Sequence, residues 1–463
     1  MRLIWRLVKG LAIFMVAAIA VLIGWLYVAP PELIRVGAGY SAKIVCSNVF
    51  LAGRDAGQVL ADDVQAPGHP LLKIMRVSVD RDRKMVSAGL FGFLGERTAV
   101  ARDGLGCTVL PEGVSADSLE QVPPASTAQA ASGSGLWPDG DGVAPSENPK
   151  LTAILDDPAM AGPGMRAMVV AKDGKIVAER YGPGFSENTP LLGWSMTKTV
   201  NAAIIGTLVK DGKMKVDDKR LFGDWQADGR ANISVADLMG MSSGLEFNED
   251  YGDVTDVTRM LFLEPDMAGF AEAKPLAHPV GSDFSYSSGT TLLLSWVWQH
   301  ALGDGAAALT WPRAKLFGPL GMDSAVLETD AAGTLVGSSY LYATARDWAR
   351  FGQFLLQDGV WKGEAVLPEG FVAWMRQPAP ASSGTYGRGQ LWLRGPSGTR
   401  EEDAALGIPG DAFWINGHDG QTVTVIPSRK LVVVRMGLTP DKLGYRPQKM
   451  VAAVVKVLDG IDD

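Results

Sequence analysis

The sequence predicts an α+β fold in which an antiparallel sheet, assembled from two distant stretches of the chain, is packed by helices. Two β-rich runs at 165–170 and 176–180 surround an Asp-Gly turn, and a second pair lies at 423–426 and 431–436. Helical spacing of apolar residues fills the region between the pairs and recurs at 449–458. Strands at both ends with helices between them imply one sheet made from both ends and covered by helices.

Length and composition exclude several classes of protein. At 463 residues the chain suggests two or three folded units, and 47% hydrophobic with 20% charged residues is typical of globular domains. Its 43 basic and 51 acidic residues give a net charge of -8, which is no footprint for nucleic acid. The four histidines, His69, His278, His300 and His418, form no close ligand pair. We therefore expect no nucleic-acid partner, no metal and no organic cofactor.

The N-terminus has the pattern of a membrane anchor. Arg2, Arg6 and Lys9 precede the uncharged stretch 11–28, whose helical length of roughly 27 Å is close to the thickness of a bilayer core. Positive charge before a span stays in the cytoplasm, so the rest of the chain is expected in the periplasm or outside the cell. This predicts a single-pass protein of the inner membrane. The alternative is a cleaved signal peptide, although residues 28–31 offer no small-x-small cleavage site.

Cys46 and Cys107 are the only cysteines, and both fall in the part expected to be exported, where thiols are usually oxidised. A single disulfide is expected, worth about 4 kcal/mol in the loop-entropy account. Two unrelated buried thiols are the alternative, because spacing does not fix their distance. The β-like runs at 73–80 and 98–110, which lie mostly between the two cysteines, predict a small α+β unit.

Composition divides the chain into four parts. Residues 1–30 form the cytoplasmic N-terminus and the span, and 31–110 form a membrane-proximal accessory domain. Residues 111–149 are rich in Pro, Ser, Ala, Gly and Asp, which is typical of a linker, although Trp137-Pro138 could dock on the next domain. Residues 150–463 form the main domain, which contains the predicted sheet.

Ser195 and Lys198 are the central candidates for chemistry. Apolar spacing from Met196 to Lys210 predicts a helix that Ser195 opens. Three residues make almost one helical turn, so the hydroxyl and the amine lie on one face, as a nucleophile and its base would. Unpaired N–H groups at the helix start favour an oxyanion there. The simpler interpretation is that Ser195 is a helix cap and Lys198 a solvated charge.

Two further segments bring the polar groups that such a site needs. Tyr286, on a loop before an apolar helix pattern, could act with Lys198 as acid and base, and Ser288 follows two residues later. At 416–421, glycines allow close backbone approach, so that a backbone N–H could complete an oxyanion hole. A half-buried core tyrosine and an ordinary Gly-rich turn are the simpler interpretations.

The three motifs, in the order Ser-x-x-Lys, Tyr-x-Ser and His-x-Gly, resemble the serine β-lactamase and penicillin-binding-protein superfamily, specifically its class C β-lactamase-like branch. Residues 233–245 and 341–351 are similar to later segments of that branch. Residues 247–251 together with 417–421 look most like the 6-aminohexanoate-oligomer hydrolases and esterases. The resemblance covers about residues 145 to 460 and implies a β-lactamase/transpeptidase-like catalytic domain there.

The resemblance also implies roles for single residues. Ser195 would be the acylated nucleophile, Lys198 the base that deprotonates it, and Tyr286 the acid-base partner for the leaving group and the deacylating water. The backbone N–H groups of Ser195 and Gln421 would hold the oxyanion. The substrate-binding positions implied in the same way are Ser288, His418, Asp419 and Gly420.

Two departures from the β-lactamase pattern bear on the substrate. Ser288 stands where β-lactamases commonly have Asn, and His418-Asp419-Gly420 stands where they have Lys-Thr-Gly. The fixed positive charge that would bind a carboxylate is missing, because histidine is mostly neutral at pH 7 and Asp419 would repel a carboxylate if it faced the cleft. These departures predict substrates without a negative charge.

We therefore expect a membrane-anchored, exported serine hydrolase that cleaves an amide or ester bond in a small molecule or peptide through an acyl-enzyme. A catalytically silent scaffold that binds peptidoglycan-like peptides in the same cleft is the alternative from another class. The sequence does not choose between amidase, esterase and D-peptidase activity, and it leaves open the oligomeric state and the role of residues 31–110.

Overall fold

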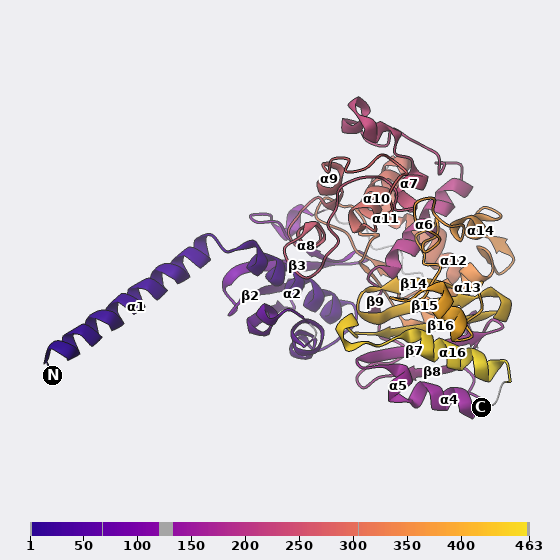
Figure 1. Cartoon of the computed structure of the whole chain (residues 1–463), viewed down its shortest axis with the longest axis horizontal. Helices are drawn as coiled ribbons and strands as arrows, with labels where there is room; N and C mark the ends of the chain where they lie inside the picture. Colours follow the sequence, from indigo (N-terminus) through magenta and orange to yellow (C-terminus); the bar gives the residue numbers. More distant parts are fainter. Residues whose placement is uncertain (1, 67, 120–132, 304, 461–463) are drawn as a thin grey trace. The chain divides into compact units, whose positions relative to one another are not determined.

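The computed structural model describes residues 2–66, 68–119, 133–303 and 305–460 (Figure 1). The chain forms two compact units. Unit 1 comprises Met1–Ala101, Cys107–Ser118 and Asp250–Pro265, and unit 2 comprises Arg102–Gly106, Leu119–Glu249 and Asp266–Asp463. The segment Asp250–Pro265 thus belongs to the same unit as the N-terminal residues, although it falls within the predicted main domain, residues 150–463. The domain boundaries expected at residues 30, 110 and 149 stay predictions.

Unit 1 begins with the apolar helix α1, Arg2–Val28. Residues Ile4–Val28 are long and apolar enough to cross a membrane, and none of the window is buried against protein. A signal sequence meets the same criteria of length and composition, so α1 is compatible with either of the two expectations for the N-terminus.

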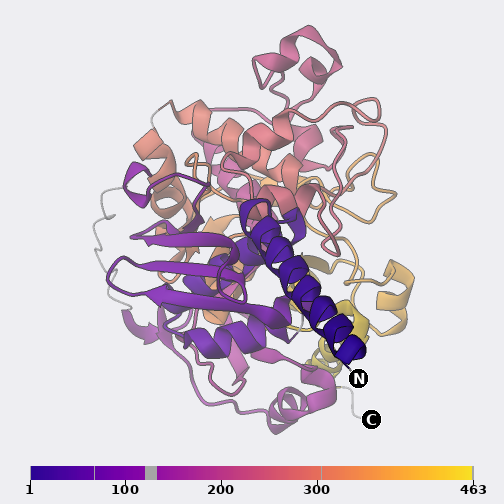
Figure 2. The same ribbon diagram turned by 90° about the vertical axis from the view of Figure 1, so that its left-hand side faces the viewer.

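The rest of unit 1 is a small sheet covered by helices (Figure 2). Helix α2, Glu32–Phe50, packs on strands β1 and β2 and on the short helix α8, Asp256–Phe262. At the α2–α8 contact, the rings of Tyr40 and Phe262 are 5.3 Å apart. The four strands, paired in the order β1-β2-β3-β4, are Met75–Asp80, Met85–Leu90, Leu94–Arg102 and Gly106–Val109.

The structure pairs the two cysteines. Cys46 on α2 is bonded to Cys107 on β4, with their Cα atoms 6.1 Å apart. Both side chains are fully buried. The predicted disulfide is present and joins α2 to the strand at the far edge of the sheet, so the alternative of two unrelated thiols is set aside.

Unit 2 is built around a five-stranded antiparallel sheet whose strand order is β14-β15-β16-β7-β8. The strands are β7 Met165–Lys172, β8 Lys175–Tyr181, β14 Phe413–Gly417, β15 Gln421–Ile426 and β16 Leu431–Gly437. Because β16 pairs with β7, two segments separated by more than 200 residues form one sheet. The predicted antiparallel sheet made from both ends of the domain is confirmed.

Helices cover both faces of this sheet, because each face is apolar. On one face lie α4, Pro149–Asp156, α5, Pro158–Ala161, and α16, Pro447–Leu458, which share a core with Met168, Val170 and Val433. On the other face lies α13, Ala345–Leu356, against β7, β15 and β16. Its Gly352 packs so closely on Val432 that an added Cβ would lie 2.6 Å from Val432 Cγ1.

The rest of unit 2 consists of helices and short strands outside the five-stranded sheet. The two long helices are α6, Met196–Lys210, and α10, Ser288–Leu302, both largely buried. Shorter elements are β5 Gly133–Leu136, β6 Gly140–Gly142, β9 Leu191–Leu192, α7 Val235–Met239, α9 Met267–Glu272, α11 Gly305–Pro312, α12 Gly318–Leu320, β10 Val326–Leu327, β11 Leu341–Ala343, β12 Val360–Trp361, β13 Glu364–Ala365, α14 Phe371–Met375 and α15 Arg400–Ala405.

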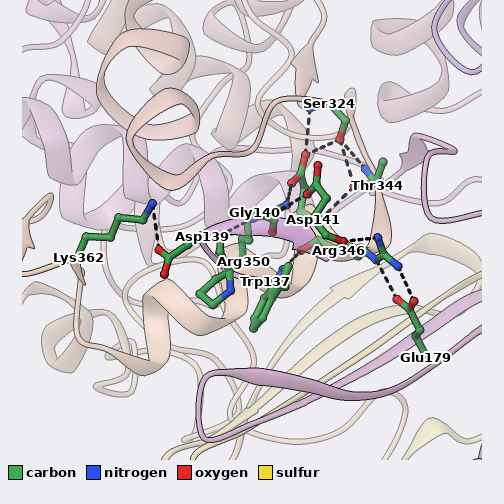
Figure 3. Close-up of polar contacts among 12 residues, drawn as sticks. Trp137, Asp139, Gly140, Asp141, Glu179, Ser324, Thr344, Arg346, Arg350 and Lys362 are labelled. Carbon is green, nitrogen blue, oxygen red and sulfur yellow. Dashed lines mark hydrogen bonds and ion pairs between the residues drawn. The ribbon is translucent and has the colours of Figure 1, made fainter. Parts of the chain in front are cut away.

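Residues 137–141 of the predicted linker are held by α13 (Figure 3). The Arg350 guanidinium donates to Pro138 O at 3.2 Å, Gly140 O at 2.7 Å and Asp141 Oδ1 at 2.6 Å. Trp137 is buried, and its indole N–H donates to Arg346 O at 3.3 Å. The expected docking of Trp137-Pro138 is therefore present within unit 2. Residues 120–132 of the predicted linker lie outside the described residues.

Candidate active site

The nucleophile candidate sits on a tight turn that leads into α6. Trp194, directly before Ser195, has φ 49, a left-handed conformation that bulky residues rarely adopt. Gly193 is required beside it, since a Cβ there would lie 2.2 Å from Trp348 Cζ2. The N–H groups of Met196, Thr197 and Lys198 are used by the carbonyls of residues 193–195. The turn therefore holds Ser195 at the helix start, as predicted.

Ser195 is not an ordinary helix cap. It occupies the N-cap position, but its side chain makes no capping hydrogen bond. Instead, Lys198 Nζ donates to Ser195 Oγ at 3.0 Å. Ser195 is partly exposed, whereas Lys198 is fully buried. Ser195 is therefore partly accessible from outside, while the neighbouring amine of Lys198 is shielded from water.

Burial gives Lys198 the properties of a base. Its ammonium also donates to Ser288 Oγ at 2.9 Å and to Ser338 O at 3.1 Å, which fix its position. Burial lowers the pKa of Lys198 from 10.5 to about 8, although the negative charge of Glu249 acts in the opposite direction. A substantial fraction of the amine is therefore neutral near physiological pH, which the interpretation as a solvated surface charge would not allow.

Tyr286 lies at the same site, on the loop before α10. Lys198 Nζ is 4.9 Å from the centre of its ring. The rings of Tyr386 and Trp392 hold Tyr286, at centroid distances of 5.9 and 5.4 Å. Burial raises the pKa of Tyr286, the charge of Glu249 raises it further, and a hydrogen bond with Ser195 acts to lower it. The phenol is therefore protonated over the physiological range and can donate a hydrogen bond.

Glu249 completes the cluster, and no role for it was inferred from the sequence. Its carboxylate accepts from the Ser288 backbone N–H at 2.7 Å and from Ser288 Oγ at 2.5 Å. Because Ser288 Oγ also accepts from Lys198, the hydroxyl bridges the amine and the carboxylate. Burial raises the pKa of Glu249, opposed mainly by the positive charge of Lys198. The only sequence signal was its place in the 247–251 stretch, which the family resemblance had singled out.

The third motif forms the turn between β14 and β15. An added Cβ on Gly417 would lie 2.2 Å from Gly193 O, and the His418 ring meets the Trp194 ring edge-on at 5.5 Å. The turn therefore lies beside the residues that precede Ser195. Gln421 begins β15, and its buried side chain accepts from the Gly437 N–H at 2.9 Å.

Asp419 lies close to His418, and the carbonyl of Gly420 is bound by Arg435. Asp419 has φ 57, and its carboxylate lies 3.5 Å from His418 Nε2. Burial raises the pKa of Asp419 and the charge of Asp441 adds to this, while the interaction with His418 and the positive charges of Lys442 and Arg166 act against it. Gly420 O accepts from Arg435 at 2.9 Å. Their predicted substrate-binding roles stay predictions.

The pH dependence of activity follows from the lowered pKa of Lys198. Only the neutral amine can take a proton, so kcat/KM should rise with pH and level off above about 8. An ordinary lysine would instead place this limb near 10.4. The measurement is kcat/KM for an uncharged ester across the pH range, with the rate of ester hydrolysis by buffer alone subtracted. A limb at the ordinary lysine value would contradict the role of Lys198 as a buried base.

Comparisons with known proteins identify the family of the chain. The sequence profile of the β-lactamase family matches residues 155–447. The 6-aminohexanoate-dimer hydrolase of Paenarthrobacter ureafaciens is 23% identical over 305 residues, which span 59% of this chain and 73% of that protein.

Two solved structures share the fold. A family VIII carboxylesterase superposes with a TM-score of 0.52 at 16% identity, over 68% of this chain and 98% of that chain. A penicillin-binding protein from Bacillus halodurans gives 0.51 at 18% identity, over 66% and 99%. The resemblance inferred from the motifs is confirmed. Since the family profile spans more than half of the sequence, this chain belongs to the β-lactamase family and is a serine hydrolase of the β-lactamase and penicillin-binding-protein type.

Proposed function

We propose that this protein hydrolyses amide or ester bonds through an acyl-enzyme on Ser195. The observation that carries the proposal is the fully buried Lys198, whose Nζ lies 3.0 Å from Ser195 Oγ and whose pKa burial lowers to about 8. In its neutral form the amine takes the Ser195 proton as Oγ attacks the carbonyl carbon of the substrate. Without the burial of Lys198, its short distance to Ser195 Oγ or its lowered pKa, Ser195 would have no effective base.

The remaining groups stabilise the tetrahedral intermediate, transfer the later protons and position Lys198. The backbone N–H groups of Ser195 and Gln421 hold the oxyanion of the tetrahedral intermediate. Tyr286, protonated and beside Ser195, passes a proton to the leaving group and then helps to take one from the attacking water. Ser288 and Glu249 fix the amine of Lys198 through the bridge of hydrogen bonds. These are positioning roles, because neither side chain is assigned to a reacting atom.

We also propose that α1 anchors the enzyme in the inner membrane and that the rest of the chain is exported. The apolar stretch Ile4–Val28 supports the anchor, and the positive residues near the N-terminus support this orientation. The disulfide between Cys46 and Cys107 is consistent with an oxidising compartment.

The site favours substrates without a negative charge. His418 and Asp419 stand where a β-lactamase has the cation that binds a carboxylate, and the Asp419 carboxylate lies 3.5 Å from His418 Nε2. A charge-assisted hydrogen bond is worth about 1.5 to 3 kcal/mol, so its absence should slow anionic substrates by roughly ten- to a hundredfold.

The test compares kcat/KM for an uncharged p-nitrophenyl ester and a chromogenic cephalosporin, in the native enzyme and in His418→Lys. The native enzyme should prefer the ester, and His418→Lys should raise cephalosporin turnover with little change for the ester. As pH falls, both rates should drop with protonation of Lys198. A native preference for the cephalosporin, or no gain in His418→Lys, contradicts this selectivity.

A further inference from the structure

One turn of unit 1 exposes apolar side chains that the rest of the fold does not cover. Phe91 and Phe93, on the turn between β2 and β3, are 57% and 50% exposed. Among the described residues outside α1, no other aromatic side chain of the Phe, Tyr or Trp type is exposed by more than about a third. Ile74, 36% exposed, joins them, since its carbonyl accepts from the Phe91 N–H at 3.1 Å. We call Ile74, Phe91 and Phe93 the turn patch.

The backbone of the turn holds the two rings in place at some cost. Phe91 has φ 55, which is unfavourable for a bulky side chain. The N–H groups of Gly92 and Phe93 donate to Gly89 O at 3.0 Å and to Leu90 O at 3.2 Å. Both a strained backbone and an uncovered aromatic pair are locally unfavourable, and such features persist where they serve a function.

The turn patch lies where the chain leaves α1. A Cβ added to Gly95 would be 3.3 Å from Pro30 Cβ and 2.8 Å from Ile34 Cγ2, and α1 ends at Val28. Phe93 is two residues from Gly95, a span of at most about 7 Å. The exposed rings therefore sit beside the first residues that follow the apolar helix.

The hairpin formed by β1 and β2 has the turn patch at its open end and charged residues at its closed end. The turn between β1 and β2 is Arg81-Asp82-Arg83-Lys84, and all four residues are exposed. Since β1 and β2 each have six residues, the two ends are about 20 Å apart. The hairpin is thus apolar at the end beside α1 and charged at the far end.

Near the turn patch, charges of both signs occur. Arg76 and Lys73 are exposed, and so is Glu96. Attraction to anionic lipid is therefore not what distinguishes this surface. Its distinguishing property is apolar aromatic area next to the end of a helix that can cross a membrane.

We infer that the turn patch inserts into the boundary between headgroups and acyl chains of the bilayer that α1 spans. This inference rests on the proposed anchoring by α1. Insertion of Phe91 and Phe93 would fix unit 1 against the membrane surface by a second contact besides α1, with the charged turn 81–84 directed away from the lipid.

The test uses nitroxide labels on single cysteines in the full chain, reconstituted in phosphatidylcholine vesicles. The two native cysteines are bonded to each other, so only an introduced cysteine reacts with the label. Phe93→Cys reports on the turn patch, Arg83→Cys on the charged end of the hairpin, and Phe14→Cys on α1. Relaxation by oxygen, which concentrates in lipid, is compared with relaxation by a water-soluble nickel chelate. Hydrolysis of an uncharged ester checks that each variant is folded.

We expect the label at position 93 to favour oxygen over nickel, as at position 14, and the label at position 83 to favour nickel. Adding Phe91→Ser to Phe93→Cys should shift position 93 toward the nickel response. A lipid response at 14 with a water response at 93 would overturn the inference and leave the anchor intact, and would point to a protein partner or free solvent at the turn patch. A water response at 14 would overturn the anchor and the inference together.

Discussion

Replacing Ser195 by alanine or Lys198 by methionine should each lower kcat/KM for an uncharged ester by about three orders of magnitude or more, and the double variant should be little worse than either. The reason is that Nζ and Oγ, 3.0 Å apart, perform one step together: without the base the hydroxyl is not activated, and without the hydroxyl the base has nothing to deprotonate. Cooperating groups of this kind are strongly non-additive.

The control for this pair is Lys210→Met. Lys210 lies at the exposed end of the same helix, α6, and should be replaced with nearly full activity retained. Effects of Ser195→Ala and Lys198→Met that multiply in the double variant would mean that the two residues act independently, which would contradict the proposed nucleophile and base.

Replacing Glu249 by glutamine should move the pH limb of kcat/KM below that of the native enzyme and lower its plateau by roughly ten- to a hundredfold. The shift has a definite sign. The negative charge of Glu249 raises the pKa of Lys198, so removing that charge lets the amine lose its proton at lower pH. The plateau falls because the amide cannot accept both Ser288 hydrogen bonds as the carboxylate does, and Ser288 then holds Lys198 less firmly.

A purely structural defect in Glu249→Gln would lower the plateau of kcat/KM without moving the pH at which kcat/KM rises. The pH of this rise therefore separates loss of the Glu249 charge from a structural defect. Glu246→Gln is the matched control, since Glu246 is exposed and three residues away. It should leave both the limb and the plateau unchanged. An unmoved limb in Glu249→Gln would show that the carboxylate does not set the pKa of Lys198.

The elements that depend on local pattern could be predicted closely. Apolar spacing and the Asp211-Gly212 stop indicated a helix from Met196 to Lys210, and α6 has these bounds. The strand pairs at both ends of the domain were likewise visible as alternating or apolar runs around short turns. Their joining into one sheet followed from their β character together with the helical patterns between them.

What escaped prediction depends on contacts between distant segments. Glu249 lies 39 residues from Ser288, and nothing in the spacing of either segment indicates that their side chains meet. The burial of Lys198 could not be predicted from the sequence either. Because α6 is buried on nearly all sides, its sequence shows no distinct polar face that would place Lys198 inside or outside. The grouping of Asp250–Pro265 with unit 1 rests on contacts such as Tyr40 with Phe262.

Composition alone does not show how part of the 111–149 stretch is held. Its Pro, Gly and Asp residues are typical of a linker, yet the carbonyls of Pro138 and Gly140 are satisfied by Arg350, more than 200 residues away. A polar, glycine-rich segment can be ordered when a buried arginine supplies the donors, and composition does not show where that arginine lies.

The most direct test of the acyl-enzyme proposal is the mass of the protein after reaction with a fluorophosphonate, followed by peptide mapping. The native enzyme should gain one adduct on Ser195, Ser195→Ala should gain none, and Lys198→Met should react far more slowly. Labelling of the native enzyme should also slow as pH falls below about 8. An unlabelled native protein that is folded, or an adduct on another serine, would contradict the assignment of Ser195 as the nucleophile.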